Sequence, residues 1–190
     1  MKILIAGDSF AALWPAASDG WVNLLANQYN VVNLAQAGVS EYKIYKQLCS
    51  IDIEEFDCVI VSHTSPSRIH TPVHPLHTEG FHKNCDLIIT DLLGHFNPFN
   101  SKLQSAKSWF KNHYDEEYQI DIYNLLRSRI NEMITIPYIS MSHIEIANRL
   151  AIEDNHIDFS HFWEQHRGDI NHYTKEGNLK VYNEILKCLT

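Results

Sequence analysis

The sequence of 190 residues has few cysteines, no long apolar run and no excess of positive charge. Its cysteines lack the paired spacing that is typical of metal sites, and they are Cys49, Cys58, Cys85 and Cys188. We interpret them as free thiols, expect Cys58 and Cys188 to be buried, and infer a reducing compartment. No segment is long enough to span a bilayer, and Gly7-Asp8 interrupts the first apolar run before a signal-peptide core forms. We therefore expect a cytoplasmic protein with no membrane partner.

The net charge is −8 with histidine neutral, so a nucleic acid is not expected as a partner. Hydrophobic residues make up 45% of the chain and charged residues 20%, as in an ordinary globular protein. The chain shows no repeat, low-complexity segment or internal linker. We therefore expect one domain over residues 1–190, and the sequence leaves its oligomeric state open.

Short apolar runs alternate with amphipathic segments along the chain. The runs at 3–5, 31–34, 56–61 and 135–141 predict buried strands, and helices are expected at 21–29, 42–48, 102–112, 115–133 and 174–189. This order predicts an α/β protein, a flavodoxin-like three-layer α/β/α sandwich with a central parallel sheet of four to five strands. Residues 69–100 are rich in proline and histidine, and we expect a long irregular connection there, of the kind that forms lids and binding loops.

Gly7-Asp8-Ser9 follows the first predicted strand, where an open α/β sheet places its ligands. The three residues could form an ordinary turn, since all are common turn formers. A serine acting as a nucleophile needs a histidine base, and that histidine needs a carboxylate to orient it. Asp169 and His172 lie three residues apart just before the last predicted helix, so one loop could present both groups.

Three short segments together resemble the sequence blocks of the GDSL/SGNH hydrolase family. They are Gly7-Asp8-Ser9, the Asn33–Ser40 stretch NLAQAGVS, and Asp169-Ile170-Asn171-His172. The resemblance implies that Ser9 is the nucleophile, His172 the general base and Asp169 the residue that orients His172. It also implies an oxyanion hole formed by the backbone N–H groups of Ser9 and Gly38.

The third block of that family has an asparagine side chain as a further oxyanion donor, whereas this chain reads Ser62-His63-Thr64-Ser65. Either His63 or Thr64 is a candidate for the missing donor, and the sequence does not choose between them. We assign Arg68 and Asp8 to substrate binding, because a cation near the site suits an anionic or sugar-bearing substrate.

These residues predict a serine esterase or acylhydrolase that needs no cofactor and cleaves a small acyl ester, with a carbohydrate-linked acetyl group as one candidate. Two alternatives stay open: an O-acyltransferase, and a non-catalytic binding or structural protein that kept the fold. A metal-dependent hydrolase is disfavoured, and we expect no metal site. Proline residues break the helical spacing of the loop histidines, and no carboxylate or thiolate set completes a site with His70, His74, His77 and His82.

Overall fold

The computed structural model describes residues 1–14 and 18–189. Within them one five-stranded sheet forms the centre of the molecule, and all of its neighbouring strands are parallel. The expected α/β class with a parallel sheet is therefore confirmed. In spatial order the strands are β2 (Asn30–Asn33), β1 (Lys2–Gly7), β3 (Cys58–His63), β4 (Tyr138–Ser142) and β5 (Ile157–Asp158).

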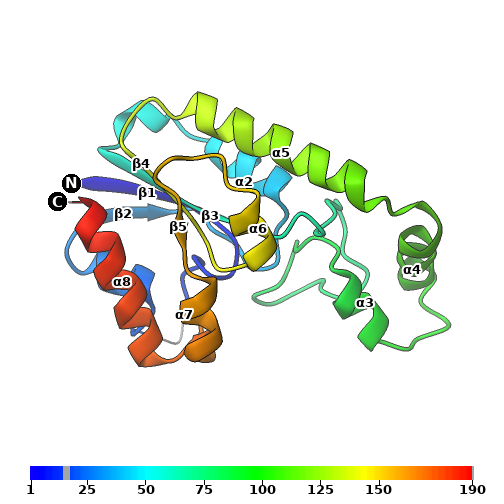
Figure 1. Ribbon diagram of the computed structural model, residues 1–190. Helices are drawn as coiled ribbons and strands as arrows, with labels where there is room; N and C mark the ends of the chain where they lie inside the picture. Colours follow the sequence, from blue (N-terminus) through cyan, green and yellow to red (C-terminus); the bar gives the residue numbers. More distant parts are fainter. Residues whose placement is uncertain (15–17, 190) are drawn as a thin grey trace.

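Helices cover both faces of the sheet, which gives the three layers of a flavodoxin-like sandwich (Figure 1). Side chains of β1 alternate between the two faces, as the pleat of a strand requires. Ile3 and Ile5 pack in one core cluster with α1 (Trp21–Ala26) and α8 (Lys175–Leu189), whereas Leu4 and Ala6 pack in the other. The second cluster includes residues of α2 (Glu41–Leu48) and α5 (Glu116–Met133).

The long connection after β3 leaves the sheet and carries its own small core. It contains α3 (Ile89–Gly94), which the sequence analysis did not predict, followed by α4 (Ser101–His113). Leu92, Leu103 and Phe110 form this third cluster, which lies to one side of the sandwich (Figure 1). The remaining short elements are a 3-10 turn (Ile53–Glu55), α6 (Glu145–Arg149), α7 (Ser160–Gln165) and β6 (Arg167–Ile170).

All four cysteines are free thiols. Cys58 is buried on β3 as expected, but the expectation for Cys188 is wrong, because it lies exposed in the last turn of α8. Among the described residues, no helix combines the length and the apolar character that crossing a membrane would require.

Candidate active site

Ser9 lies in a tight turn at the carboxyl end of β1. The strand ends at Gly7, where a Cβ atom would come within 2.7 Å of the Ser62 Cβ on β3, so only glycine fits this close approach. The backbone N–H of Ala11 then donates to the Asp8 carbonyl at 3.1 Å and closes the turn. Ser9 is only 4% exposed. Its hydroxyl is thus held at the sheet edge where parallel α/β proteins bind their ligands.

His172 reaches the same edge from the loop between β6 and α8. Asn171 and His172 both adopt left-handed backbone angles, with φ of 51° and 65°. Such angles are strained for residues other than glycine, and this strain is typical of functional sites. The Asn171 side-chain amide donates to the carbonyl oxygens of Ser9 at 3.3 Å and Ala12 at 2.7 Å. These two bonds fasten the histidine loop to the serine turn.

The Ser9 Oγ and the His172 Nε2 lie 2.7 Å apart, within hydrogen-bond reach. The ring of Phe10 packs against the imidazole of His172, with 4.5 Å between ring centroids, and stacks on buried His143 at 4.4 Å. Burial lowers the pKa of His172, an effect that Asp8 partly opposes and that Arg68 and His82 reinforce. The imidazole is therefore neutral at pH 7 and able to accept a proton from the serine hydroxyl.

Asp169 does not reach His172, so the expected carboxylate contact is absent from the structure. Asp169 is exposed, and no hydrogen bond or ion pair joins it to His172 within residues 1–14 and 18–189. The physical reason is local. The left-handed angles at positions 171 and 172 turn the imidazole toward Ser9, while Asp169 stays in β6, on an antiparallel bridge segment that faces solvent.

Asp8 is the buried carboxylate of this site. It is fully buried, and the Arg68 Nη1 lies 3.1 Å from its Oδ2, which also accepts a hydrogen bond from the Thr64 hydroxyl at 3.1 Å. Its other oxygen accepts from the Phe10 backbone N–H at 3.0 Å. Arg68 donates further to the Val39 carbonyl at 3.0 Å. Both residues that we assigned to substrate binding therefore lie next to the serine, already paired with each other.

Neither His63 nor Thr64 is available as the further oxyanion donor. The two ring nitrogens of His63 are occupied by Glu41 at 2.6 Å and the Tyr138 hydroxyl at 2.9 Å, in a buried cluster behind the sheet edge. The Thr64 hydroxyl is committed to Asp8. The backbone N–H groups of Ser9 and Gly38 make no hydrogen bond to the described part of the chain. The two groups that the resemblance names as oxyanion donors are thus unpaired.

The loop after β3 brings together residues that the sequence analysis judged unable to form a metal site. His74, His77 and Cys85 each offer one ligand atom, and these atoms lie within 4.8 Å of one another. The statement that no thiolate completes a set with the loop histidines is therefore wrong. Cys85 has no regular spacing from the histidines in the sequence, so only the fold of the loop shows that it lies beside them. His70 is directed elsewhere, to Asp86 at 3.1 Å.

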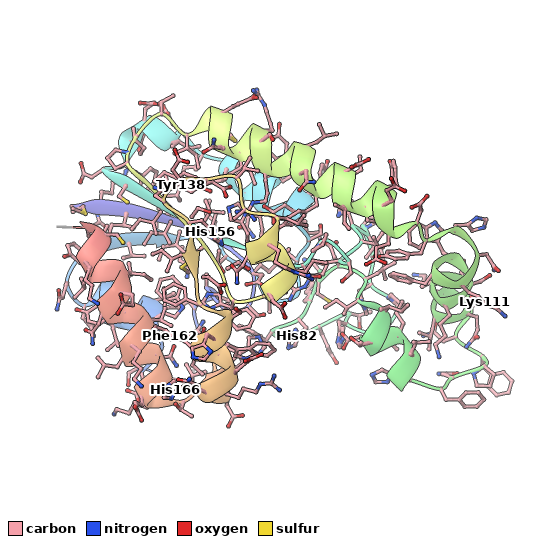
Figure 2. The ribbon with its side chains drawn as sticks, viewed as in Figure 1. His82, Lys111, Tyr138, His156, Phe162 and His166 are labelled. Carbon is pink, nitrogen blue, oxygen red and sulfur yellow. The ribbon has the colours of Figure 1, made fainter. Side chains whose placement is uncertain are left out.

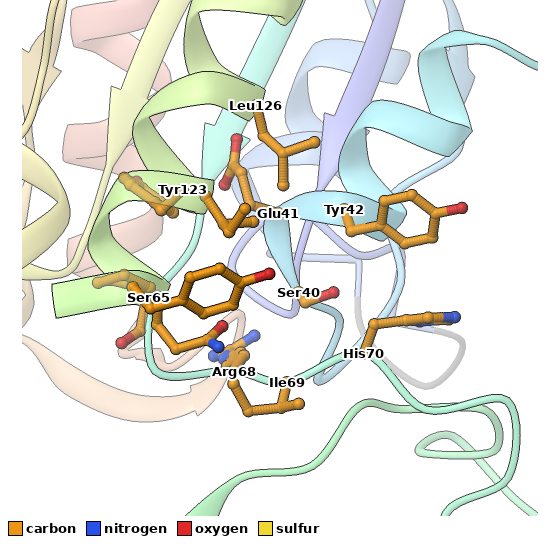
Figure 3. A pocket seen from close by; sticks show the side chains of 13 residues that line it. Ser40, Glu41, Tyr42, Ser65, Arg68, Ile69, His70, Tyr123 and Leu126 are labelled. Carbon is orange, nitrogen blue, oxygen red and sulfur yellow. The ribbon is translucent and has the colours of Figure 1, made fainter. Parts of the chain in front are cut away.

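A pocket of about 350 Å³ lies on the other side of Arg68 (Figure 3). Ser9 and His172 are not among its lining residues, but Arg68 lines it and also contacts Asp8. Its walls combine aromatic rings with a few polar groups, a composition that is typical of sites for small organic ligands. The residues that line it come from the β3–α3 loop, α2 and α5, and include Ser65, His70, Tyr42, Tyr118 and Tyr123.

The sequence analysis missed two residues, Phe10 and Asn171, that hold Ser9 and His172 in place. Phe10 follows the serine directly, and its ring fixes the orientation of His172. Asn171 precedes the histidine, and its amide joins the two loops. Both adjoin residues that were singled out, so their positions were visible. Their roles depend on contacts between segments more than 150 residues apart, as the separation of 162 between Asn171 and Ser9 shows.

In comparisons with known proteins, no family model matches this chain and no curated protein matches it. The likeness to the GDSL/SGNH hydrolases therefore depends on three short motifs and on the geometry that joins the first of them to the last.

Proposed function

We propose that this chain is a serine esterase that hydrolyses a small acyl ester, with a carbohydrate-linked acetyl group as one candidate. The single observation that supports it most is the 2.7 Å separation between the Ser9 Oγ and the His172 Nε2. A nucleophile and a base within hydrogen-bond reach, beside unpaired backbone donors, are the groups that acyl transfer requires.

The reaction then has two stages. The Ser9 Oγ attacks the ester carbonyl carbon while His172 takes its proton, and the negative charge that forms on the carbonyl oxygen meets the N–H groups of Ser9 and Gly38. His172 returns the proton to the departing alcohol, which leaves the acyl group on Ser9. A water molecule activated by His172 then attacks the acyl-enzyme and releases the acid and the free serine.

Asp8 is the carboxylate that stabilises the protonated form of His172, a role that the resemblance assigns to Asp169. Its buried negative charge favours the protonated form of His172, which develops as the serine is deprotonated. Arg68 has the opposite effect on His172 and faces the pocket, where its charge suits an anionic or sugar-bearing substrate. The pocket beyond it is the proposed place for the part of the substrate that does not react.

The test compares Ser9→Ala and His172→Ala with the wild-type chain, using p-nitrophenyl acetate as the substrate. Each variant should lose at least about 10³-fold in kcat/KM, because neither group alone activates the nucleophile. Asp169→Asn is the matched control, and it should retain activity within about threefold because Asp169 does not contact the base. Far-UV circular dichroism checks that each variant folds. Activity retained by Ser9→Ala would refute the proposal.

The pH dependence of kcat/KM offers a second test. His172 acts as a base only when neutral, and burial lowers its pKa. Activity should therefore rise with pH along a limb centred below the usual histidine value of about 6.5. A limb centred above that value would contradict the assignment of His172 as a buried base.

A specific observation favours one other candidate, a non-catalytic binding protein. Asp169 does not reach His172, and neither His63 nor Thr64 is free as a third oxyanion donor. Loss of one such donor costs about 10²–10³ in turnover in other hydrolases. A fluorophosphonate probe separates the two candidates, since labelling of Ser9 requires an activated hydroxyl. Product analysis with and without a sugar acceptor separates hydrolysis from acyl transfer.

The cytoplasm remains the proposed location, because all four cysteines are free thiols and two of them are buried.

A further inference from the structure

The loop between β3 and α3 folds back on itself through a short antiparallel bridge. The backbone N–H and carbonyl of Ile69 exchange hydrogen bonds with those of Leu87, at 3.0 and 2.9 Å. This bridge sets residues 70–77 against residues 82–86. His74 and His77 on the first arm therefore face Cys85 on the second, with one ligand atom of each within 4.8 Å of the other two.

His74 is a buried imidazole with one unused nitrogen. Its side chain is 2% exposed, and its Nε2 is buried and has no hydrogen-bond partner in the described part of the chain. Its Nδ1 accepts from the backbone N–H groups of Leu76 and His77, both at 3.1 Å. Because Nδ1 accepts, Nε2 carries the proton of the neutral ring, and a buried N–H without an acceptor costs free energy.

His77 has the supporting contact that metal-bound histidines usually show. Its Nε2 lies 3.2 Å from the Asp91 carboxylate, which leaves Nδ1 as the available nitrogen. A carboxylate on the far nitrogen fixes the tautomer and makes the imidazole a stronger ligand. The rings of His74 and His77 lie 4.6 Å apart, and burial together with His77 lowers the pKa of His74 to about 4. The His74 imidazole is therefore neutral at pH 7, the charge state in which histidine binds a cation.

Cys85 completes the donor set with a buried sulfur. It is 1% exposed and forms no disulfide. Burial raises the pKa of its thiol to about 11, so the group is protonated when no cation is present. Two imidazoles and one thiolate are ligands for a borderline-soft ion such as Zn²⁺, whereas Mg²⁺ and Ca²⁺ prefer oxygen ligands.

We propose that His74, His77 and Cys85 bind one Zn²⁺ ion, with water or the nearby His82 in the fourth position. The Cys85 thiol loses its proton to solvent on binding, and no oxidation is involved. His74 must carry its proton on Nδ1 when Nε2 holds the metal. In the structure without metal, two backbone N–H groups of the turn at residues 74–77 point at Nδ1. A proton on Nδ1 would face these donors, so the turn must shift when the metal binds.

The proposed ion is structural, because the loop that it ties down packs on the oxyanion glycine. A Cβ at Gly38, which has a φ of 72°, would lie 2.6 Å from the Cys85 Cβ. The next residue, Asp86, donates its backbone N–H to the Gly38 carbonyl at 2.9 Å and accepts from the Ser40 N–H at 2.7 Å. The zinc site thus holds the loop against the β2–α2 turn. This inference does not depend on the proposed esterase activity.

The experiment measures metal binding by the full chain, prepared without a histidine tag and stripped with a chelator. Equilibrium dialysis against Zn²⁺ should give one tightly held ion per chain. Co²⁺ used as a spectroscopic probe should give tetrahedral absorption bands and a thiolate-to-cobalt charge-transfer band, and Zn²⁺ should displace it. Failure of the wild-type chain to hold one equivalent of either ion at micromolar concentration would overturn the proposal.

Matched variants locate the site. Cys85→Ser should abolish the charge-transfer band, and His74→Asn should weaken binding more than about tenfold, a loss of the size seen when metal sites are disrupted. Asparagine keeps an acceptor near the Nδ1 position, so the 74–77 turn is retained and a folding defect is not expected. Cys188→Ser and His95→Asn make the same changes at exposed positions and should bind like the wild type. Equal binding by Cys85→Ser and Cys188→Ser would refute the site.

Discussion

Two buried histidine clusters of this molecule differ in whether their polar atoms have partners. Behind β3 and β4, the Arg127 cluster groups seven side chains, and Figure 2 labels two of them, Tyr138 and His156. In the loop, His74, His77 and Cys85 form the His74 cluster, which has a buried nitrogen with no partner among residues 1–14 and 18–189. The Arg127 cluster consists of Glu41, His63, Arg127, Tyr138, Ser140, Glu153 and His156.

The buried polar groups of the Arg127 cluster find hydrogen-bond partners within the protein. The Arg127 guanidinium is fully buried and donates to both oxygens of Glu153, and also to the Ala147 carbonyl at 2.7 Å. Both nitrogens of His156 are bonded, to Ser140 and to Asn148, each at 2.7 Å. A closed network of this kind needs nothing from outside, whereas the open His74 cluster needs a ligand.

The largest expected effect on the free energy of unfolding comes from a change in the Arg127 cluster. Arg127→Met leaves the Glu153 carboxylate buried without its cation, which should lower the free energy of unfolding by about 3–5 kcal/mol. Urea denaturation measures this. Arg129→Met is the matched control on the same helix, since its ion pair with Glu132 is exposed to solvent and should contribute little to stability. Similar losses for the two variants would mean that the buried cluster is not the stronger element.

The pH dependence of stability comes next. Burial, with Arg127 and His63, lowers the pKa of His156 to about 4, although Glu153 and Asp158 oppose this, and burial lowers the pKa of His143 as well. Below pH 6.5 the unfolded chain takes up protons that the folded chain does not, so stability must fall as the pH falls from 7 toward 4. The urea midpoint should be lower at pH 5 than at pH 7. An equal or higher midpoint at pH 5 would contradict this account of the buried histidines.

A smaller effect should follow from Tyr138→Phe. The change removes the hydroxyl that lies 2.9 Å from the buried His63 Nε2 and leaves that nitrogen with a longer contact, 3.6 Å, to the Glu153 carboxylate. We expect a loss of about 1 kcal/mol in the free energy of unfolding. Tyr29→Phe, on a tyrosine outside the cluster, provides the comparison by urea denaturation. No difference between the two variants would show that His63 does not need this hydroxyl.

The smallest effect on the free energy of unfolding should come from a change in the His74 cluster. In the presence of a chelator, His74→Asn should change the free energy of unfolding by less than about 0.5 kcal/mol. Asparagine keeps the acceptor and removes the unpartnered nitrogen, which offsets the small cavity that it creates. With zinc added, only the wild-type chain should gain in thermal midpoint. A large loss without metal would make His74 a structural residue like His63.

The strands of the sheet could be predicted from the sequence because the pattern of a strand is local. The runs around β1, β2, β3 and β4 were all found, whereas β5 has two residues and gives no periodic pattern. Ser9, Gly38 and His172 could be named from motifs at fixed spacing. The position of Asp169 could not, because the left-handed angles at 171 and 172 decide which way each side chain turns.

The loop was misjudged for a related reason. Its prolines correctly excluded helical spacing for the histidines, but they gave no information about a bridge between Ile69 and Leu87. That bridge places Cys85 among residues eight and eleven positions earlier in the chain. Likewise, the sequence offered His63 and Thr64 as alternatives. Only their partners, Glu41 and Asp8, show that both side chains are engaged elsewhere.

The bond between Ser9 and His172 closes a span of 163 residues. A ribosome that has just made the serine must therefore add most of the remaining chain before the base arrives. A nascent chain that stops short of position 172 lacks the imidazole, so its Ser9 hydroxyl has no histidine at this contact.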